Sequence, residues 1–176
     1  MAVCFLLVTW FCRSDVFGSV GQLLGAVFFL GLFPLLAYPL QRLFPRFRSR
    51  GRAGQRILAM LFALAGYLLG MAYSLIFGAA QGVWVIYLAY FCSGLGIFLL
   101  NRLFGKKASG HACGVIGPTA LFAYFGLYAA AAAGLGIAVL TCCASVRTGR
   151  HTVPQLIAGC LVPCVVMTAV WLITRG

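Results

Sequence analysis

Long apolar stretches that carry almost no charge limit the folds open to this chain. About 20 apolar residues are enough for an α-helix to cross the hydrocarbon core of a bilayer. The stretches cover residues 17–40, 57–77, 82–103, 112–146 and 153–173. Hydrophobic residues make up 64% of the 176 residues and the mean hydropathy is +1.08, which soluble globular domains do not reach. The sequence therefore predicts an all-α, polytopic membrane helix bundle, with residues 1–176 forming a single integral membrane domain.

The apolar stretch of residues 112–146 decides how many helices the bundle contains. It is too long for one span, and Gly126 is the best position for a break between two shorter helices. The break gives about six transmembrane helices. Six helices place the polar residues near 106–111 and 147–151 on the same side of the membrane, whereas five would place them on opposite sides.

The N-terminal part of the chain leaves two alternatives open. Residues 1–12 are apolar but too short to span a bilayer, so they form either an interfacial segment or the start of a tilted first helix. The first full span is predicted over residues 17–40, and we expect Pro34 and Pro39 to bend its end.

A basic loop between the first two spans predicts the orientation of the bundle. Residues 41–55 hold five arginines, namely Arg42, Arg46, Arg48, Arg50 and Arg52. Arg56 follows directly after this loop. Short loops rich in Lys and Arg face the cytoplasm, so this loop and the polar residues near 106–111 and 147–151 are predicted to be cytoplasmic. A binding site for lipid headgroups is the alternative interpretation of the loop.

The charge balance excludes several kinds of chemistry. Thirteen Lys and Arg residues face a single acid, Asp15, so neither paired catalytic carboxylates nor carboxylate cages for Mg²⁺ or Ca²⁺ can form. The eight cysteines lie mostly in apolar runs and are interpreted as small hydrophobic residues, although Cys160 and Cys164 share a helix face and could pair. For so apolar and basic a chain, anionic lipids are more plausible partners than nucleic acid.

The first polar cluster, residues 106–111, precedes an apolar helix. Ser109, Gly110 and His111 lie where the first backbone N–H groups of a helix lack internal partners and attract anions, and Lys107 could add charge to the same anion. This pattern is typical of a phosphate cradle. It fits equally well an ordinary N-cap at Ser109 beside lysines that only set topology.

The second polar cluster contains the other histidine. A neutral His151 could attack phosphorus while a protonated His111 gives a proton to the leaving oxygen. Arg147 and Arg150 suit the nonbridging oxygens of a phosphate. Gln155 lies one helical turn from His151 and could accept its Nδ1 proton, but it also occupies the third position of a capping box.

Together the two motifs, K-x-S-G-H and R-x-x-R-H-T-x-x-Q-x-x-A-G, resemble those of the type 2 phosphatidic acid phosphatase superfamily. The resemblance covers about residues 80–176. It implies a six-helix membrane enzyme that removes phosphate from lipid phosphates or diphosphates without a metal or other cofactor. It also implies roles for five residues: His151 as the nucleophile that forms a phosphohistidine, His111 as general acid, Ser109 and Gly110 as the phosphate-cradling pair, and Lys107 as the lysine of the first motif.

The chain departs from the family pattern at three places. The Arg-Pro pair that normally follows the first-motif lysine is missing, and Ser145 stands where the third-motif arginine is expected. Arg147 or Arg150 would have to replace that arginine. Gln155 occupies the place of the usual Asp, as is also found in members that act on polyprenyl diphosphates, such as dolichyl diphosphatases.

The sequence thus leads to one function and two alternatives. The leading hypothesis is a membrane-embedded, metal-independent phosphatase of a lipid phosphate or isoprenoid diphosphate that works through a phosphohistidine. One alternative is a non-catalytic relative that binds anionic lipids or partner proteins through its basic face. The other is a small transporter subunit, although the spans carry no buried charges that would mark a transport path.

Overall fold

The computed structural model describes residues 1–103 and 108–175 of the chain, and the regular elements in these ranges are all helical. The chain therefore forms the all-α bundle that the sequence predicts. Five helical segments are long and apolar enough to cross a membrane: Val20–Leu43, Gly51–Ile76, Gln81–Arg102, Tyr128–Arg147 and Val153–Thr174. These segments identify the chain as an integral membrane protein.

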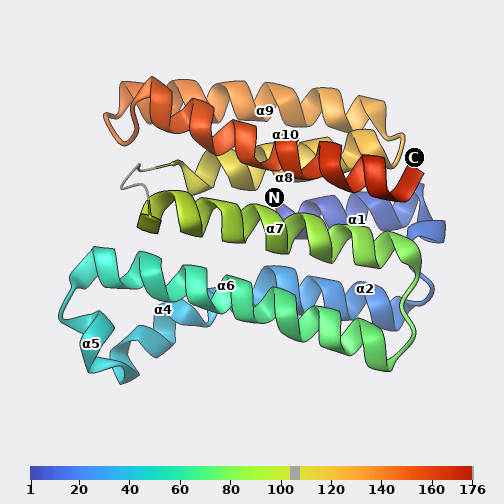
Figure 1. Cartoon of the computed structure of the whole chain (residues 1–176), viewed down its shortest axis with the longest axis horizontal. Coiled ribbons are helices and arrows are strands. Elements are labelled where there is room, and N and C mark those ends of the chain that lie inside the picture. Colours follow the sequence, from blue (N-terminus) through green and yellow to red (C-terminus); the bar gives the residue numbers. More distant parts are fainter. Residues whose placement is uncertain (104–107, 176) are drawn as a thin grey trace.

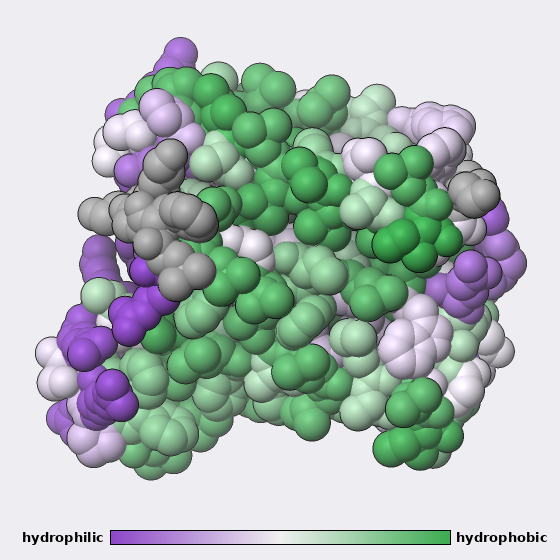
Figure 2. Space-filling model, viewed as in Figure 1, coloured by the Kyte–Doolittle hydropathy of each residue, from purple (hydrophilic) through white to green (hydrophobic). Residues whose placement is uncertain are grey.

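The long helices lie side by side along the longest axis of the molecule (Figure 1). The helices α8 (Gly110–Tyr124), α9 (Tyr128–Arg147) and α10 (Val153–Arg175) pack together, and α7 (Gln81–Leu103) joins α10 to α6 (Gly51–Ile76). On the face seen in Figure 2, hydrophobic residues cover the middle of the bundle and hydrophilic residues gather at its two ends. This distribution matches a bundle whose helices cross the hydrocarbon layer lengthwise.

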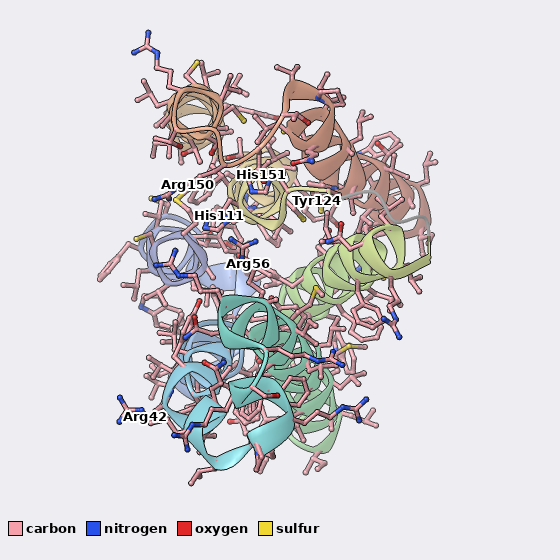
Figure 3. All side chains as sticks on the ribbon, turned by 90° about the vertical axis from the view of Figure 1, so that its left-hand side faces the viewer. Arg42, Arg56, His111, Tyr124, Arg150 and His151 are labelled. Carbon is pink, nitrogen blue, oxygen red and sulfur yellow. The ribbon has the colours of Figure 1, made fainter. Side chains whose placement is uncertain are left out.

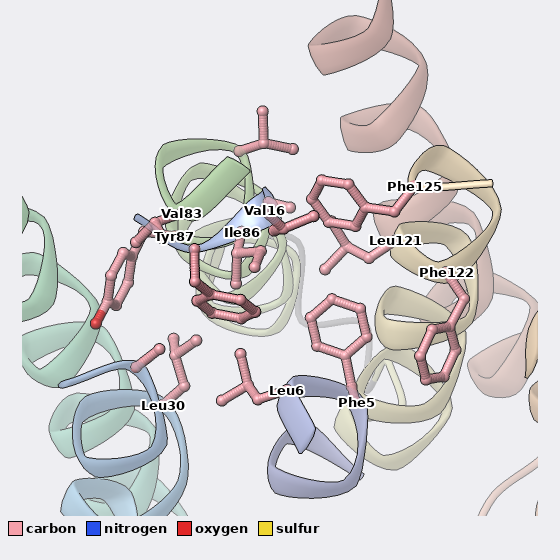
Figure 4. Close-up of a cluster of buried hydrophobic side chains, with 14 of the residues drawn as sticks. Phe5, Leu6, Val16, Leu30, Val83, Ile86, Tyr87, Leu121, Phe122 and Phe125 are labelled. Atoms are coloured by element: carbon pink, nitrogen blue, oxygen red, sulfur yellow. The ribbon is translucent and has the colours of Figure 1, made fainter. Parts of the chain in front are cut away.

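Helix α1 (Ala2–Cys12) is an integral part of the core. Phe5, Leu6 and Thr9 are fully buried, and the Phe5 ring packs against Phe122 of α8 (Figure 4). The other face of the helix is exposed, at Leu7, Val8 and Phe11. A 3-10 turn, η1 (Ser14–Val16), separates the helix from the first long span, so the alternative in which residues 1–12 begin that span is wrong.

The first long span is irregular. It consists of α2 (Val20–Ala26), a π-helical stretch η2 (Val27–Leu32), the short helices α3 (Phe33–Leu35) and α4 (Ala37–Leu40), and the 3-10 turn η3 (Gln41–Leu43). Proline has no backbone N–H to bond the carbonyl four residues earlier. The predicted effect of Pro34 and Pro39 is confirmed, because the helix is interrupted at Leu36 between them.

The predicted basic loop is shorter than the sequence suggests. Residues 45–48 form the short helix α5 (Pro45–Arg48), and α6 begins at Gly51 rather than near residue 57. The predicted boundary was wrong because it followed hydropathy, whereas Arg, Ala and Gln in residues 52–56 are good helix formers. The first turns of α6 are therefore polar and extend the helix beyond its apolar part.

The predicted break at Gly126 is confirmed. Gly126 has a φ of +78°, and its N–H and that of Leu127 bond the carbonyls of Ala123 and Phe122 at the end of α8. This is the Schellman arrangement, in which a left-handed residue, nearly always glycine, ends a helix. Helix α8 has 15 residues and is thus only about 22 Å long, shorter than a full span.

The only acidic residue of the chain lies at the same end of the bundle as Gly126. Asp15 pairs with Arg13 at 2.8 Å, and Arg13 Nη1 also donates to the carbonyl oxygen of Phe125 at 2.7 Å. The hydrogen bond from Arg13 lowers the pKa of the Asp15 carboxyl below its ordinary value, and the same bond raises the pKa of Arg13. Arg13 therefore caps the C-terminus of α8 and neutralises the single carboxylate.

Helices α8 and α10 each have a proline where they pack against each other. Each contains an internal proline, Pro118 and Pro163, and both side chains are fully buried. Gly117, next to Pro118, faces Pro163, since a Cβ added to Gly117 would lie 3.8 Å from Cβ of Pro163. At the far end the Tyr124 hydroxyl and Thr174 Oγ1 are hydrogen-bonded at 2.8 Å. The two helices are thus joined over most of the length of α8.

Candidate active site

The two histidines of the chain meet at one end of the bundle. In Figure 1 the start of α8, the start of α10 and the start of α6 all lie at this end. The ring centroids of His111 and His151 are 6.5 Å apart, with 51° between the ring planes. His111 is exposed and His151 half-buried, so a group bound between the rings can contact both.

The start of α8 leaves backbone donors beside His111. Ser109 is the N-cap residue, fully buried, and its Oγ accepts a hydrogen bond from Ala112 N at 3.3 Å. Ser109 thus makes the hydrogen bond of an ordinary N-cap, which was one of the two interpretations of this motif. Among the described residues, none accepts a hydrogen bond from the N–H of Gly110 or His111. These two groups, at the positive end of a 15-residue helix, are suited to an anion.

The end of α9 fixes the direction of the loop that carries His151. Gly149 has a φ of +63°, and the N–H groups of Gly149 and Arg150 bond the carbonyls of Val146 and Ser145 at 3.0 Å each. His151 N also approaches the carbonyl of Ser145, at 3.4 Å. Ser145 therefore contributes its backbone carbonyl to a second Schellman motif, which turns the chain toward α8.

Gln155 fills both of the roles that the sequence left open. Its Oε1 lies 3.2 Å from Nδ1 of His151 and 3.4 Å from the backbone N of Thr152. The second bond is one half of a capping box at the start of α10, in which the third helical residue accepts from the backbone N–H of the N-cap residue. The first one requires that Nδ1 carries the proton, because a carbonyl oxygen only accepts. In the neutral imidazole this places the free lone pair on Nε2.

A close contact between α8 and α10 holds the two histidines in register. Ser109 N donates to the backbone carbonyl of Gln155 at 2.9 Å, so the start of one helix is bonded to the first turn of the other. Gly159 faces the same point. A Cβ on Gly159 would overlap the Ser109 carbonyl oxygen and lie 3.1 Å from Ser109 N. The absence of a side chain at residue 159 is what permits the contact.

Replacing Gly159 with alanine should therefore separate the helices at the site. We expect the added methyl group to lower the free energy of unfolding by about 1–3 kcal/mol, the usual cost of overpacking against rigid backbone. The measurement is thermal unfolding in detergent. Gly114→Ala on α8 is the matched control, since a Cβ there meets nothing within 4 Å. Equal destabilisation by both substitutions would contradict the role assigned to Gly159.

The cationic residues predicted for the site have different positions. Figure 3 shows Arg150 beside the histidine pair, on the same loop as His151. Arg147 instead lines an apolar groove of about 510 Å³ between α9 and α10, together with residues such as Cys142, Leu156 and Cys160, and neither histidine lines this groove. Lys107 lies outside the described residues. Of the two predicted arginines, Arg150 is therefore the one that accompanies the histidines.

One cation near the histidines was not among the predicted site residues. Figure 3 shows the side chain of Arg56 extending from α6 toward His111 and His151, whereas Arg42 lies apart from them. The sequence placed Arg56 only at the edge of a basic loop. The signal that could have found it is its helical register, since Met60 one turn later packs against the cluster of Ala108 and Cys113 at the start of α8.

The site thus combines two imidazoles, the free N–H groups at the start of α8 and two guanidinium groups. Such a set favours an anion and offers a nucleophile and a proton donor in reach of it. All eight cysteines are free thiols, and no group of three or more metal-ligating side chains occurs among the described residues. No protein-family model, curated protein or solved structure matches the chain.

Proposed function

We propose that the protein is a membrane-embedded phosphatase that removes phosphate from a lipid phosphate or an isoprenoid diphosphate through a phosphohistidine at His151. The observation that carries the proposal is the meeting of the two histidines, whose ring centroids are 6.5 Å apart although 40 positions separate the residues in the chain. Two imidazoles at this distance can flank one phosphoryl group, His151 as the nucleophile and His111 as the proton donor.

In the first step, Nε2 of His151 attacks phosphorus and the bond from phosphorus to the lipid oxygen breaks. His111, in its protonated form, gives its proton to that oxygen, so the lipid leaves as a neutral alcohol or as a monophosphate. Gln155 keeps the proton of His151 on Nδ1 through their 3.2 Å contact, which directs Nε2 to the substrate.

In the second step, water attacks the phosphohistidine. His111, now neutral, takes a proton from this water, the bond from phosphorus to Nε2 breaks, and inorganic phosphate leaves. Both histidines then regain their starting states. The charge on the nonbridging oxygens is met by the N–H groups of Gly110 and His111 and by the guanidinium of Arg150. No metal takes part in either step.

The membrane supplies the substrate in this proposal. The site lies at a polar end of an apolar bundle (Figure 2), where the headgroup of a lipid would reach it while its chains stay in the hydrocarbon layer. That this end faces the cytoplasm stays a prediction from the basic loop. The substrate class follows from the chemistry of the site, since phosphate is the group that the donors and the two histidines suit.

The test is phosphate release by the detergent-purified protein in the presence of EDTA. The panel contains phosphatidate, phosphatidylglycerophosphate and undecaprenyl diphosphate. We expect release from at least one of these lipids at an undiminished rate with the chelator. Loss of release with EDTA and its return with added metal would contradict the metal-independent mechanism.

The outcome also separates the phosphatase from a binding protein. A folded sample that binds anionic lipid vesicles but releases no phosphate from the panel would favour the non-catalytic alternative. The basic residues around the site would then act as a docking surface for lipid headgroups. The orientation of His151 Nε2 by Gln155 favours the catalytic proposal, because a surface that only binds anions has no need of a fixed imidazole tautomer.

A further inference from the structure

Arg56 lies on a helix that contributes none of the motif residues. It is the sixth residue of α6, it is exposed, and α6 belongs to the part of the chain before residue 80. The basic loop that precedes α6 explains an arginine here as a topology signal. That explanation does not specify in which direction the side chain points.

The packing of α6 determines that direction. Residues four apart lie on the same face of a helix. Met60 packs against a cluster formed by Ile97, Ala108 and Cys113, and thus faces the start of α8. Arg56, one turn closer to the end of the bundle, lies on this face at the level where α8 begins. Figure 3 agrees, showing its guanidinium directed to the histidine pair.

Arg56 has no carboxylate to neutralise it. Asp15 is the only acidic side chain of the chain, and it is paired with Arg13 at the other end of the bundle. Arg56 and Arg150 therefore bring two positive charges to a site without a negative side chain. Two such charges beside the histidines make the local potential positive, which attracts an anion.

We propose that Arg56 binds the phosphate of the substrate, on the side of the site opposite to the start of α8. The proposal rests on the proposed function for the identity of the anion. The guanidinium fork presents two N–H groups to two nonbridging oxygens, while Gly110 N, His111 N and Arg150 meet the remaining ones. The phosphate then lies between α6 and α8, with His151 Nε2 directed to phosphorus.

The test compares three variants in two assays. Arg56→Gln removes the charge, Arg56→Lys keeps it without the fork, and Arg42→Gln is the matched control from the same basic region. The first assay measures kcat/KM for a short-chain phosphatidate in detergent. The second measures binding of orthovanadate, a phosphate analogue, by calorimetry, and does not depend on turnover.

We expect Arg56→Gln to weaken vanadate binding and to lower kcat/KM by about 10- to 100-fold, as for the loss of a charge-assisted hydrogen bond. Arg56→Lys should fall between Arg56→Gln and the wild type, and Arg42→Gln should stay within about twofold of the wild type, as suits an exposed charge away from the site. Arg56→Gln that behaves like Arg42→Gln in both assays would overturn the proposal.

The two assays also distinguish this proposal from the proposed function. A wild-type protein that releases phosphate, with an unaffected Arg56→Gln variant, would leave the phosphatase standing and remove Arg56 from its site. A protein that releases no phosphate but binds vanadate through Arg56 would refute the phosphatase and keep Arg56 as a residue that binds phosphate. A wild type that neither hydrolyses the lipid nor binds vanadate would refute both. Equal melting temperatures of Arg56→Gln and Arg42→Gln ensure that a loss of binding is not a loss of fold.

Discussion

Replacing His151 with alanine is expected to reduce phosphate release on the order of 10³-fold or more. The substitution removes the atom that bonds to phosphorus, and loss of a nucleophile abolishes the covalent route entirely. The measurement is release of phosphate from whichever lipid of the panel the wild type hydrolyses. His151 is half-buried in a loop, so its truncation should leave the melting temperature of the protein nearly unchanged.

The covalent intermediate gives a second measurement on the same variant. Rapid quenching of the wild type with ³²P-labelled substrate should trap label on the protein in a bond that is labile to acid and stable to base, as expected of a phosphorus–nitrogen bond. The His151→Ala protein should carry no label. Label that persists in this variant, or activity within about tenfold of the wild type, would show that another group attacks phosphorus.

Replacing His111 with asparagine should separate the two chemical steps. For a lipid substrate the leaving oxygen needs a proton, so we expect a decrease in rate of about 10²–10⁴-fold, the range of general acid catalysis. For p-nitrophenyl phosphate, whose leaving group is stable without a proton, phosphorylation of His151 should remain fast. Hydrolysis of the phosphohistidine should be slow with either substrate, because in the variant no base takes the proton of the attacking water.

The expected signature is a burst of about one p-nitrophenol per active site followed by slow turnover. Stopped-flow absorbance measures it directly. His111→Asn that slows both substrates by the same factor and shows no burst would remove His111 from proton transfer. It would instead assign the residue a role in binding, since its exposed ring also neighbours the free N–H groups of α8.

The sequence predicted those parts of the fold that depend on local patterns. The apolar spans, the break at Gly126 and the helix ends near Ser109 follow from hydropathy and from capping residues that lie within a few positions of one another. Helix α1 was not predictable in this way. Its burial depends on Phe122 and other residues more than 100 positions away, which hydropathy does not report.

The same distinction applies to the site. His111 and His151 belong to two short motifs, and a single structural inference, the number of helices between them, was enough to predict their meeting. Arg56 has no motif of its own. Its place depends on the rotation of α6 about its axis, which is set by the contact of Met60 with residues of α7 and α8. Arg147, by contrast, belongs to a motif, but it lines the apolar groove between α9 and α10 and not the histidine site.

The prolines of α8 and α10 have a consequence for how the site could move. Pro118 and Pro163 remove the N–H groups that would bond the carbonyls of Gly114 and Gly159, and these gaps occur where the two helices touch. The segments on the site side are bonded to each other through Ser109 and Gln155. The bond between Ser109 and Gln155 therefore links the two segments that lie before the prolines, so a bend at the prolines would carry both segments together.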